Sequence, residues 1–117
     1  MSYQPGLHLV ATLQAANTQP LNQYENFRQL IDDLIGRYGL QKLGEVYHNF
    51  TPAGFTAVVC LSESHLSVHT WPEFGRINLD IYLSNYLRRN EGTVQELYAE
   101  MQRFFSATIS DEHFLTR

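Results

Sequence analysis

Apolar and polar residues alternate along much of this chain, and a period of two is typical of β-strands with one buried face. In the first such segment, residues 6–13, the alternate positions are Leu7, Leu9 and Ala11. The same reasoning predicts further strands at residues 42–50, 55–61, 65–71, 76–83 and 107–115. The turns between the four central segments are short, so consecutive strands are expected to pair antiparallel.

Two other segments have apolar residues at helical spacing. In the first, apolar positions run from Leu21 to Tyr38, Pro20 is suited to the first helical turn, and Gly39 is a typical stop. In the second, residues 93–96 (Thr-Val-Gln-Glu) predict a capping box at the start of an apolar helix face.

The predicted order β-α-β-β-β-β-α-β fits one α+β domain over residues 1–117, a two-layer sandwich whose mainly antiparallel sheet carries two helices on one face. The composition agrees, because 44% hydrophobic and 17% charged residues are typical of a globular protein. A net charge of −4, with eight Lys and Arg residues, excludes the cationic surface that binding to duplex nucleic acid requires. The basic pair Arg88-Arg89 is expected in a solvated loop.

No apolar run approaches the length of a membrane span, and the first residues lack the pattern of a secretory signal. We therefore expect no membrane partner and a cytoplasmic location. The single cysteine, Cys60, cannot form an internal disulfide or a cysteine-based metal site, and we expect it to be a small buried hydrophobic residue.

Chemically reactive side chains concentrate between residues 61 and 73, where hydroxyls, carboxylates and two histidines occur together. On a strand, His65, Ser67 and His69 share one face. The spacing alone leaves four interpretations open: a solvated strand face, a metal site at the histidines, a hydrolase triad, or an acyl shift at a strained serine peptide bond. A metal site lacks a clear third ligand, and a triad lacks the G-x-S-x-G motif.

Residues 62–73 read Ser-Glu-Ser-His-Leu-Ser-Val-His-Thr-Trp-Pro-Glu, a run in which many positions are closely specified. Together with residues 47–61 before it, this run closely resembles the proenzymes of bacterial and archaeal S-adenosylmethionine decarboxylases. The resemblance extends through Asp80-Ile81-Tyr82, is weaker over the first strand and helix, and fades after Ser84. It implies the fold of that family and decarboxylation of S-adenosylmethionine for spermidine synthesis.

The resemblance further implies that the protein makes its own cofactor. The hydroxyl of Ser64 would attack the carbonyl of Glu63 and convert the peptide bond into an ester, and β-elimination would then cut the chain between these two residues. The products would be a β chain of residues 1–63 and an α chain of residues 64–117, which begins with a pyruvoyl group derived from Ser64. This ketone forms a Schiff base with the substrate amine and draws electrons from it.

Several matched positions take roles from the resemblance. His69 and Thr56 would assist self-cleavage, Phe50 would stack on the adenine ring, and Glu73 would accept hydrogen bonds from the ribose hydroxyls. Leu66 would also contribute to substrate binding. Family members assemble from two processed protomers with active sites near the contact, so the resemblance implies a homodimer. We expect no metal, because the two histidines lack a clear third ligand.

One position departs from the family pattern. The family has Thr-Cys-Gly where this chain has Leu83-Ser84-Asn85, and that cysteine donates the proton in decarboxylation. A thiol has a pKa of about 8.5, whereas a serine hydroxyl is a much weaker acid, so Ser84 would be a poor donor. The change from glycine to Asn85 alters backbone freedom. Cys60 is not expected to replace the missing thiol, because it would lie about 13 Å along its strand from Thr56.

Ser84 keeps two alternatives open. The same scaffold could decarboxylate another amino acid, such as ornithine or arginine. The chain could instead be a homologue that is not a decarboxylase and that binds a small ligand or a partner subunit.

Overall fold

The computed structural model describes residues 3–86 and 88–117. Its strands are β1 (Leu7–Gln14), β2 (Lys42–Asn49), β3 (Phe55–Leu61), β4 (Ser64–Trp71), β5 (Arg76–Leu83) and β6 (Thr108–Thr116). Its helices are α1 (Glu25–Arg37) and α2 (Glu91–Phe105), with short 3-10 turns at Gln19–Leu21 and Pro72–Phe74. The strands form one sheet in the order β2-β3-β4-β5-β1-β6, and each neighbouring pair is antiparallel.

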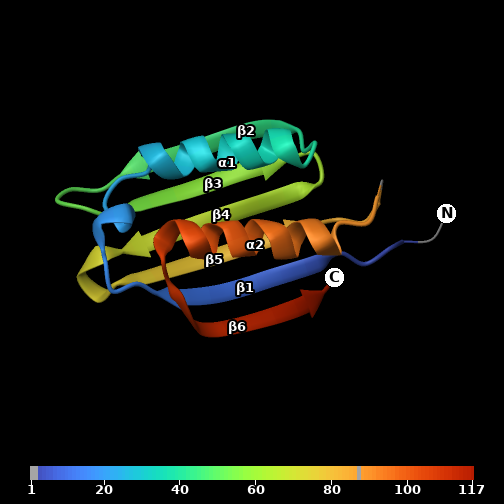
Figure 1. The fold of residues 1–117 in the computed structure, drawn as a ribbon. Coiled ribbons are helices and arrows are strands. Elements are labelled where there is room, and N and C mark those ends of the chain that lie inside the picture. Colours follow the sequence, from blue (N-terminus) through green and yellow to red (C-terminus); the bar gives the residue numbers. More distant parts are fainter. Residues whose placement is uncertain (1–2, 87) are drawn as a thin grey trace.

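Both helices lie on the same face of this sheet, α1 over β2 and β3 and α2 over β5 and β1 (Figure 1). The predicted two-layer α+β sandwich with two helices on one face is therefore confirmed. Short connections link the four consecutive strands β2, β3, β4 and β5, and each of these strands lies next to the following one in the sheet. β1 and β6 then complete the sheet beside β5.

The core lies between the sheet and the helices. Because residues three and four apart share one helix face, α1 buries Phe27, Ile31 and Leu34 against the sheet. The ring of Phe27 lies 5.5 Å from that of Phe55 on β3 and 5.6 Å from that of Phe105 on α2, measured between centroids. These rings join both helices to the sheet, and this packing holds β3 and its neighbours in place.

No helix of the described chain covers the opposite face of the sheet, which is called the open face below. On β4 this face carries His65, Ser67 and His69, as predicted, while Leu66 and Val68 are buried on the helical side. Cys60 is exposed on the open face, so the prediction of a buried cysteine is wrong. The alternation along β3 turns its side chain away from the helices.

Both helices begin at positions that differ from the prediction. Pro20 lies in a separate 3-10 turn, and α1 begins only at Glu25. α2 begins at Glu91, so Thr93 lies within the helix and the predicted capping box is wrong. The N-cap residue is the buried Asn90, and its side-chain amide donates to the carbonyl of Ser84 at 2.8 Å. This contact ties the residue before α2 to the chain just beyond β5.

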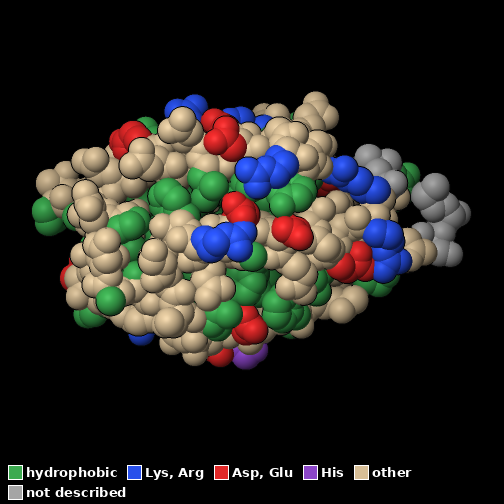
Figure 2. Space-filling view, viewed as in Figure 1, with side chains coloured by type: hydrophobic (Ala, Val, Ile, Leu, Met, Phe, Trp, Pro, Cys, Tyr) green, Lys and Arg blue, Asp and Glu red, His purple; other side chains and the backbone are tan. Residues whose placement is uncertain are grey.

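Charged side chains of both signs are interspersed over the helical face (Figure 2). Lys42, for example, pairs with Asp32 and Glu45 at 2.9 and 2.8 Å.

Among the helices that the structure describes, none is long and apolar enough to cross a membrane.

Candidate active site

The predicted cleavage position lies in the tight turn between β3 and β4. Leu61 and Ser64 pair across this turn, so Ser62 and Glu63 form its loop. Ser64 has a φ of 140°, and within residues 3–86 and 88–117 only Ser106 shares a positive φ among residues other than glycine. Such a conformation costs a serine about 1–3 kcal/mol, and strain of this kind clusters at functional sites.

This backbone angle turns the serine side chain towards the carbon that its hydroxyl would attack. Around the N–Cα bond of an L-residue, Cβ is offset by about 120° from the carbonyl carbon. With a φ of 140°, the torsion from the Glu63 carbonyl carbon to the Cβ of Ser64 is therefore about 20°. In ordinary strand or helix conformations the two atoms are far from eclipsed. When Oγ of Ser64 attacks the carbonyl carbon of Glu63, these two atoms close a five-membered ring with N, Cα and Cβ of Ser64. The near-eclipsed arrangement is the one that this ring requires.

Ser84 lies beside the carbonyl of the same peptide bond. Its backbone N–H donates to the carbonyl oxygen of Glu63 at 2.8 Å. β5 carries it there, because Leu83 at the end of that strand pairs with Ser64. Negative charge develops on this oxygen when a hydroxyl adds to the carbonyl, and a donor already in place stabilises it. This contribution comes from the backbone and does not depend on the side chain at position 84.

The chain after β5 is fixed by buried amide side chains. Asn85 donates to the carbonyl of Pro5 at 2.7 Å and accepts a bond from the N–H of Asn90 at 2.7 Å. Asn85 is not among the residues with positive φ, so this position does not require glycine. Gly6 is different, because a Cβ added there would lie 2.4 Å from the carbonyl oxygen of Leu83. The main chain can pass this close to the end of β5 only with glycine at position 6.

A second group of predicted residues lies at the opposite end of β4. Thr56 and His69 are cross-strand partners, and Thr56 Oγ1 lies 2.5 Å from His69 Nδ1. Together with Phe50 and Glu73 they line a cavity of about 350 Å³. Phe50 offers a half-exposed aromatic ring, while Glu73 and His69 offer polar atoms. An aromatic wall with a few polar groups suits a ligand that combines a flat ring with hydroxyls.

The walls of this cavity are held by the turn between β2 and β3. Thr70 is buried, and its Oγ1 accepts a bond from the N–H of Phe55 at 2.8 Å and donates to the carbonyl of Leu21 at 2.7 Å. Gly54 has a φ of 104°, and its N–H donates to the carbonyl of Asn22 at 2.9 Å. These bonds fix the turn against the 3-10 segment, so the cavity has rigid sides.

The two groups of predicted residues do not meet within one chain. Ser64 and His69 are five positions apart on an extended strand, which corresponds to about 17 Å. One end of β4 therefore holds Glu63, Ser64 and Ser84, and the other end holds Phe50, Thr56, His69 and Glu73. The histidine and the threonine that were expected to assist cleavage are out of reach of the serine of their own chain.

Known proteins share this arrangement of strands and this motif. The sequence pattern of the S-adenosylmethionine decarboxylase family matches residues 7–117. The chain belongs to this family.

Two relatives and one solved structure show the extent of the similarity. The S-adenosylmethionine decarboxylase proenzyme of Archaeoglobus fulgidus is 39% identical over 77 residues, which are 66% of this chain and 69% of that protein. The proenzyme of Persephonella marina is 40% identical over 77 residues, 66% of this chain and 58% of that protein. The crystal structure of the adenosylmethionine decarboxylase from Aquifex aeolicus matches with a TM-score of 0.79 and 25% identity, and the match covers 99% of this chain and 91% of that one.

The family inferred from residues 47–73 is thus confirmed. The S-adenosylmethionine decarboxylases are carboxy-lyases, and their proenzyme form implies a pyruvoyl cofactor. The roles of the individual site residues stay predictions.

Two of the sequence interpretations do not fit the geometry. The side chain of Leu66 is 1% exposed and faces the helices, so it cannot contact a substrate on the open face. A metal site at His65 and His69 is also unsupported, because four positions along a strand separate them by about 13 Å. In the described part of the chain, no three His, Cys, Asp or Glu side chains come together as ligands.

The structure adds two residues that the sequence did not single out. Trp71 lines the cavity beside Glu73, and its signal in the sequence was a lone tryptophan at a strand end before proline. Arg88 lies in an exposed loop, as expected, but its guanidinium also binds the carboxylate of Glu63. The adjacent basic pair gave no sign that one of its members faces the cleavage turn.

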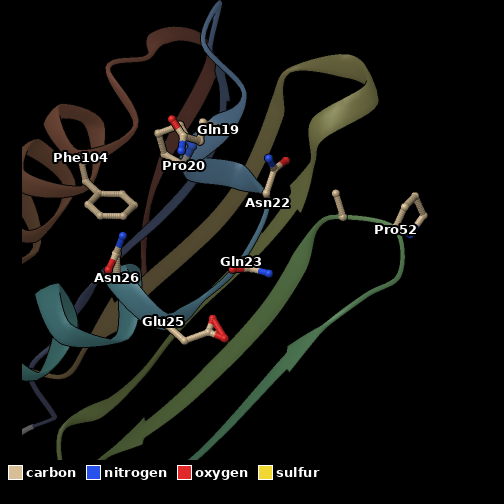
Figure 3. Close-up of a pocket in the computed structure, with 9 residues that line it drawn as sticks. Gln19, Pro20, Asn22, Gln23, Glu25, Asn26, Pro52 and Phe104 are labelled. Carbon is tan, nitrogen blue, oxygen red and sulfur yellow. The ribbon is translucent and has the colours of Figure 1, made fainter.

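A larger hollow of about 650 Å³ lies on the other side of the turn between β2 and β3 (Figure 3). It shares Pro52 and Ala53 with the smaller cavity, and Phe104 of α2 forms part of its wall. Most of its other lining residues are amides before and at the start of α1, namely Gln19, Asn22, Gln23 and Asn26. None of the predicted site residues lines it, so we assign the substrate cavity to the smaller space.

Proposed function

We propose that this chain is a self-cleaving S-adenosylmethionine decarboxylase whose pyruvoyl cofactor derives from Ser64. The observation that carries the proposal is the geometry of the peptide bond between Glu63 and Ser64. The strained φ of Ser64 turns its Cβ towards the carbonyl carbon, and the N–H of Ser84 already binds the carbonyl oxygen. This is the geometry that the first step of self-cleavage needs, and family membership supplies the reaction.

Self-cleavage requires only the chain and water. Oγ of Ser64 adds to the carbonyl carbon of Glu63, the C–N bond breaks, and the nitrogen takes up a proton as Glu63 becomes the ester of Ser64. Loss of the α-proton of Ser64 then expels the Glu63 carboxylate by β-elimination. The dehydroalanine that remains tautomerises to an imine, and water releases ammonia to leave the pyruvoyl group. Once present, this group supplies the electron sink that decarboxylation requires.

The cavity at the other end of β4 supports an adenosyl substrate. Phe50 presents a flat aromatic surface that suits a purine ring, and the carboxylate of Glu73 can accept hydrogen bonds from two ribose hydroxyls. Ornithine and arginine have neither group and would leave this aromatic wall unused. The cavity therefore favours S-adenosylmethionine over the two alternative substrates.

Replacing Glu73 with glutamine is expected to raise the KM for S-adenosylmethionine by about 10-fold, because a neutral amide accepts weaker hydrogen bonds than a carboxylate. The extent of self-cleavage should stay unchanged. Steady-state release of CO₂ from fully cleaved protein measures the effect, and Glu91→Gln, which alters a carboxylate at the surface, serves as the control. An unchanged KM would remove Glu73 from the substrate site.

The direct test of the reaction is CO₂ release from S-adenosylmethionine, ornithine and arginine in parallel, with the cleaved protein and with its Ser84→Cys variant. We expect release from S-adenosylmethionine alone. Release from ornithine or arginine instead would contradict the substrate assignment. A cleaved protein that acts on none of the three, even with cysteine at position 84, would contradict decarboxylation and favour a ligand-binding homologue.

The separation of the two residue groups supports a homodimer with shared sites. A two-fold axis in the gap between two stacked sheets, perpendicular to β4 and level with its middle near Ser67, would set the open faces of the sheets against each other. Ser64 of one chain would then lie over His69 of the partner subunit. Stacked sheets are about 10 Å apart, a gap that two facing side chains can span. The exposed Val46 and Val58 on the open face also suit burial in such a contact.

Two variants that cannot cleave alone are expected to restore cleavage when they share a dimer. Ser64→Ala lacks the nucleophile and His69→Ala lacks the assisting histidine, but a mixed dimer contains one complete site. Co-expression with different tags, followed by intact mass measurement of each chain, should show cleavage of the His69→Ala chain only. Mixed dimers in which both chains stay whole would contradict the shared site, as would full cleavage of His69→Ala by itself.

A further inference from the structure

Arg88 ties the residue before the scissile bond to two other segments of the chain. Its Nε donates to Glu63 Oε1 and its Nη2 donates to Glu63 Oε2, both at 3.0 Å, so the guanidinium holds the carboxylate with a pair of bonds. Nη2 also donates to the carbonyl oxygens of Tyr38 at 3.1 Å and Gly39 at 3.2 Å. These carbonyls follow the end of α1, where the partial negative charge of the helix favours a cation.

Glu63 depends on this arginine for its position. It lies in a tight turn, where an acidic side chain is normally solvated, yet it is only 8% exposed. A carboxylate removed from water needs a partner that replaces its hydration. Among the ion pairs of the described residues, the one with Arg88 is the only pair that Glu63 makes.

The same stretch of chain holds both the side chain and the carbonyl of Glu63. Ser84 binds the carbonyl oxygen through its N–H, and Arg88 binds the carboxylate through its guanidinium. Both belong to the chain between β5 and α2, which Asn85 and Asn90 anchor at its start and end. A shift of the Glu63 side chain would therefore move its carbonyl relative to the hydroxyl of Ser64 and the N–H of Ser84.

We infer that Arg88 is a positioning residue for self-cleavage. It touches none of the reacting atoms. By fixing Glu63 it keeps the carbonyl carbon near the hydroxyl of Ser64 and keeps the carbonyl oxygen on the N–H of Ser84. This inference rests on the proposed self-cleavage and names the residue that holds the acyl side of the scissile bond.

The test compares self-cleavage rates of full-length chains made by cell-free translation, with intact mass measured over time. Arg88→Ala is expected to cleave about 10- to 100-fold more slowly than the parent, the usual effect of a small misplacement of reacting atoms. Arg88→Lys should fall between the two, because an ammonium keeps the charge but cannot bind both oxygens in parallel. Arg89→Ala is the matched control and should cleave like the parent, since Arg89 pairs with the surface residue Glu91.

Two further measurements separate positioning from general stabilisation. Millimolar guanidinium chloride should speed cleavage of Arg88→Ala, whereas sodium chloride at the same ionic strength should not, because the small cation can occupy the place of the lost side chain. Hydroxylamine cleaves esters, so it cuts any chain that has reached the ester between Glu63 and Ser64. It should add little to the cleaved fraction of Arg88→Ala, because the ester forms slowly in the absence of Arg88. Thermal unfolding of both alanine variants shows whether the fold is retained.

The outcomes distinguish this inference from the proposed function. If the parent cleaves and Arg88→Ala cleaves equally fast, Arg88 is not a positioning residue and self-cleavage stands. A slow Arg88→Ala that guanidinium does not restore, or that accumulates a hydroxylamine-sensitive ester, also overturns the inference, in favour of a role in stability or in β-elimination. If the parent itself never cleaves, the proposed function fails and this inference fails with it.

Discussion

Replacing Ser64 with alanine is expected to abolish self-cleavage, so that the purified protein stays one chain. The methyl group of alanine offers no nucleophile, and the neighbouring His65, whose Nδ1 lies 3.5 Å from the Ser64 hydroxyl, cannot form the ester that leads to a pyruvoyl group. The fold should survive, because alanine meets the same backbone strain at a φ of 140° that serine already bears. Intact mass spectrometry of freshly purified protein measures the result.

The neighbouring Ser62 provides a matched control. It lies in the same turn, but its hydroxyl is on the other side of Glu63, so Ser62→Ala should cleave like the parent. A cleaved Ser64→Ala chain, or an uncleaved Ser62→Ala chain with a normal fold, would show that the wrong serine has been assigned.

Replacing Ser84 with cysteine is expected to raise the rate of decarboxylation by about 100-fold, within the range that a well-placed general acid contributes. A thiol has a pKa of about 8.5 and can donate a proton near neutral pH, which a serine hydroxyl does poorly. Self-cleavage should stay unchanged, because position 84 contributes its backbone N–H to that step. The two rates are measured separately, by CO₂ release from cleaved protein and by intact mass over time.

Cys60→Ser tests whether the existing thiol takes part in decarboxylation. Cys60 is exposed on β3 and pairs with His65, so it does not line the substrate cavity at the other end of the strands. Its replacement should change neither rate. If Ser84→Cys gives no gain, another group donates the proton, and a loss of activity in Cys60→Ser would identify that group.

Strands β1, β3, β4 and β5 could be predicted from the sequence because each has one face buried against the helices and one face that is more exposed. Residues 55–61 and 76–83 match β3 and β5 at both ends. The start of α2 was predicted wrongly, because the Thr-x-x-Glu pattern at residues 93–96 lies inside the helix. The helix begins at Glu91, after Asn90, whose side-chain amide binds the carbonyl of Ser84 just beyond β5.

The residues of the candidate site could be named from a contiguous motif, but their grouping in space could not. A strand extends by about 3.4 Å per residue, so a motif that is compact in sequence becomes two separate groups. The strain at Ser64 and the pair between Glu63 and Arg88 were also beyond the sequence, because both depend on how β5 and the following chain approach the turn. In that pair, the partners are 25 positions apart.

Intact mass spectrometry of the purified parent protein, after long incubation, tests the central claim most directly. The account predicts two pieces, residues 1–63 and residues 64–117, with a pyruvoyl group in place of Ser64 at the start of the second. A single mass for the whole chain would contradict it, and so would a cut at any other peptide bond.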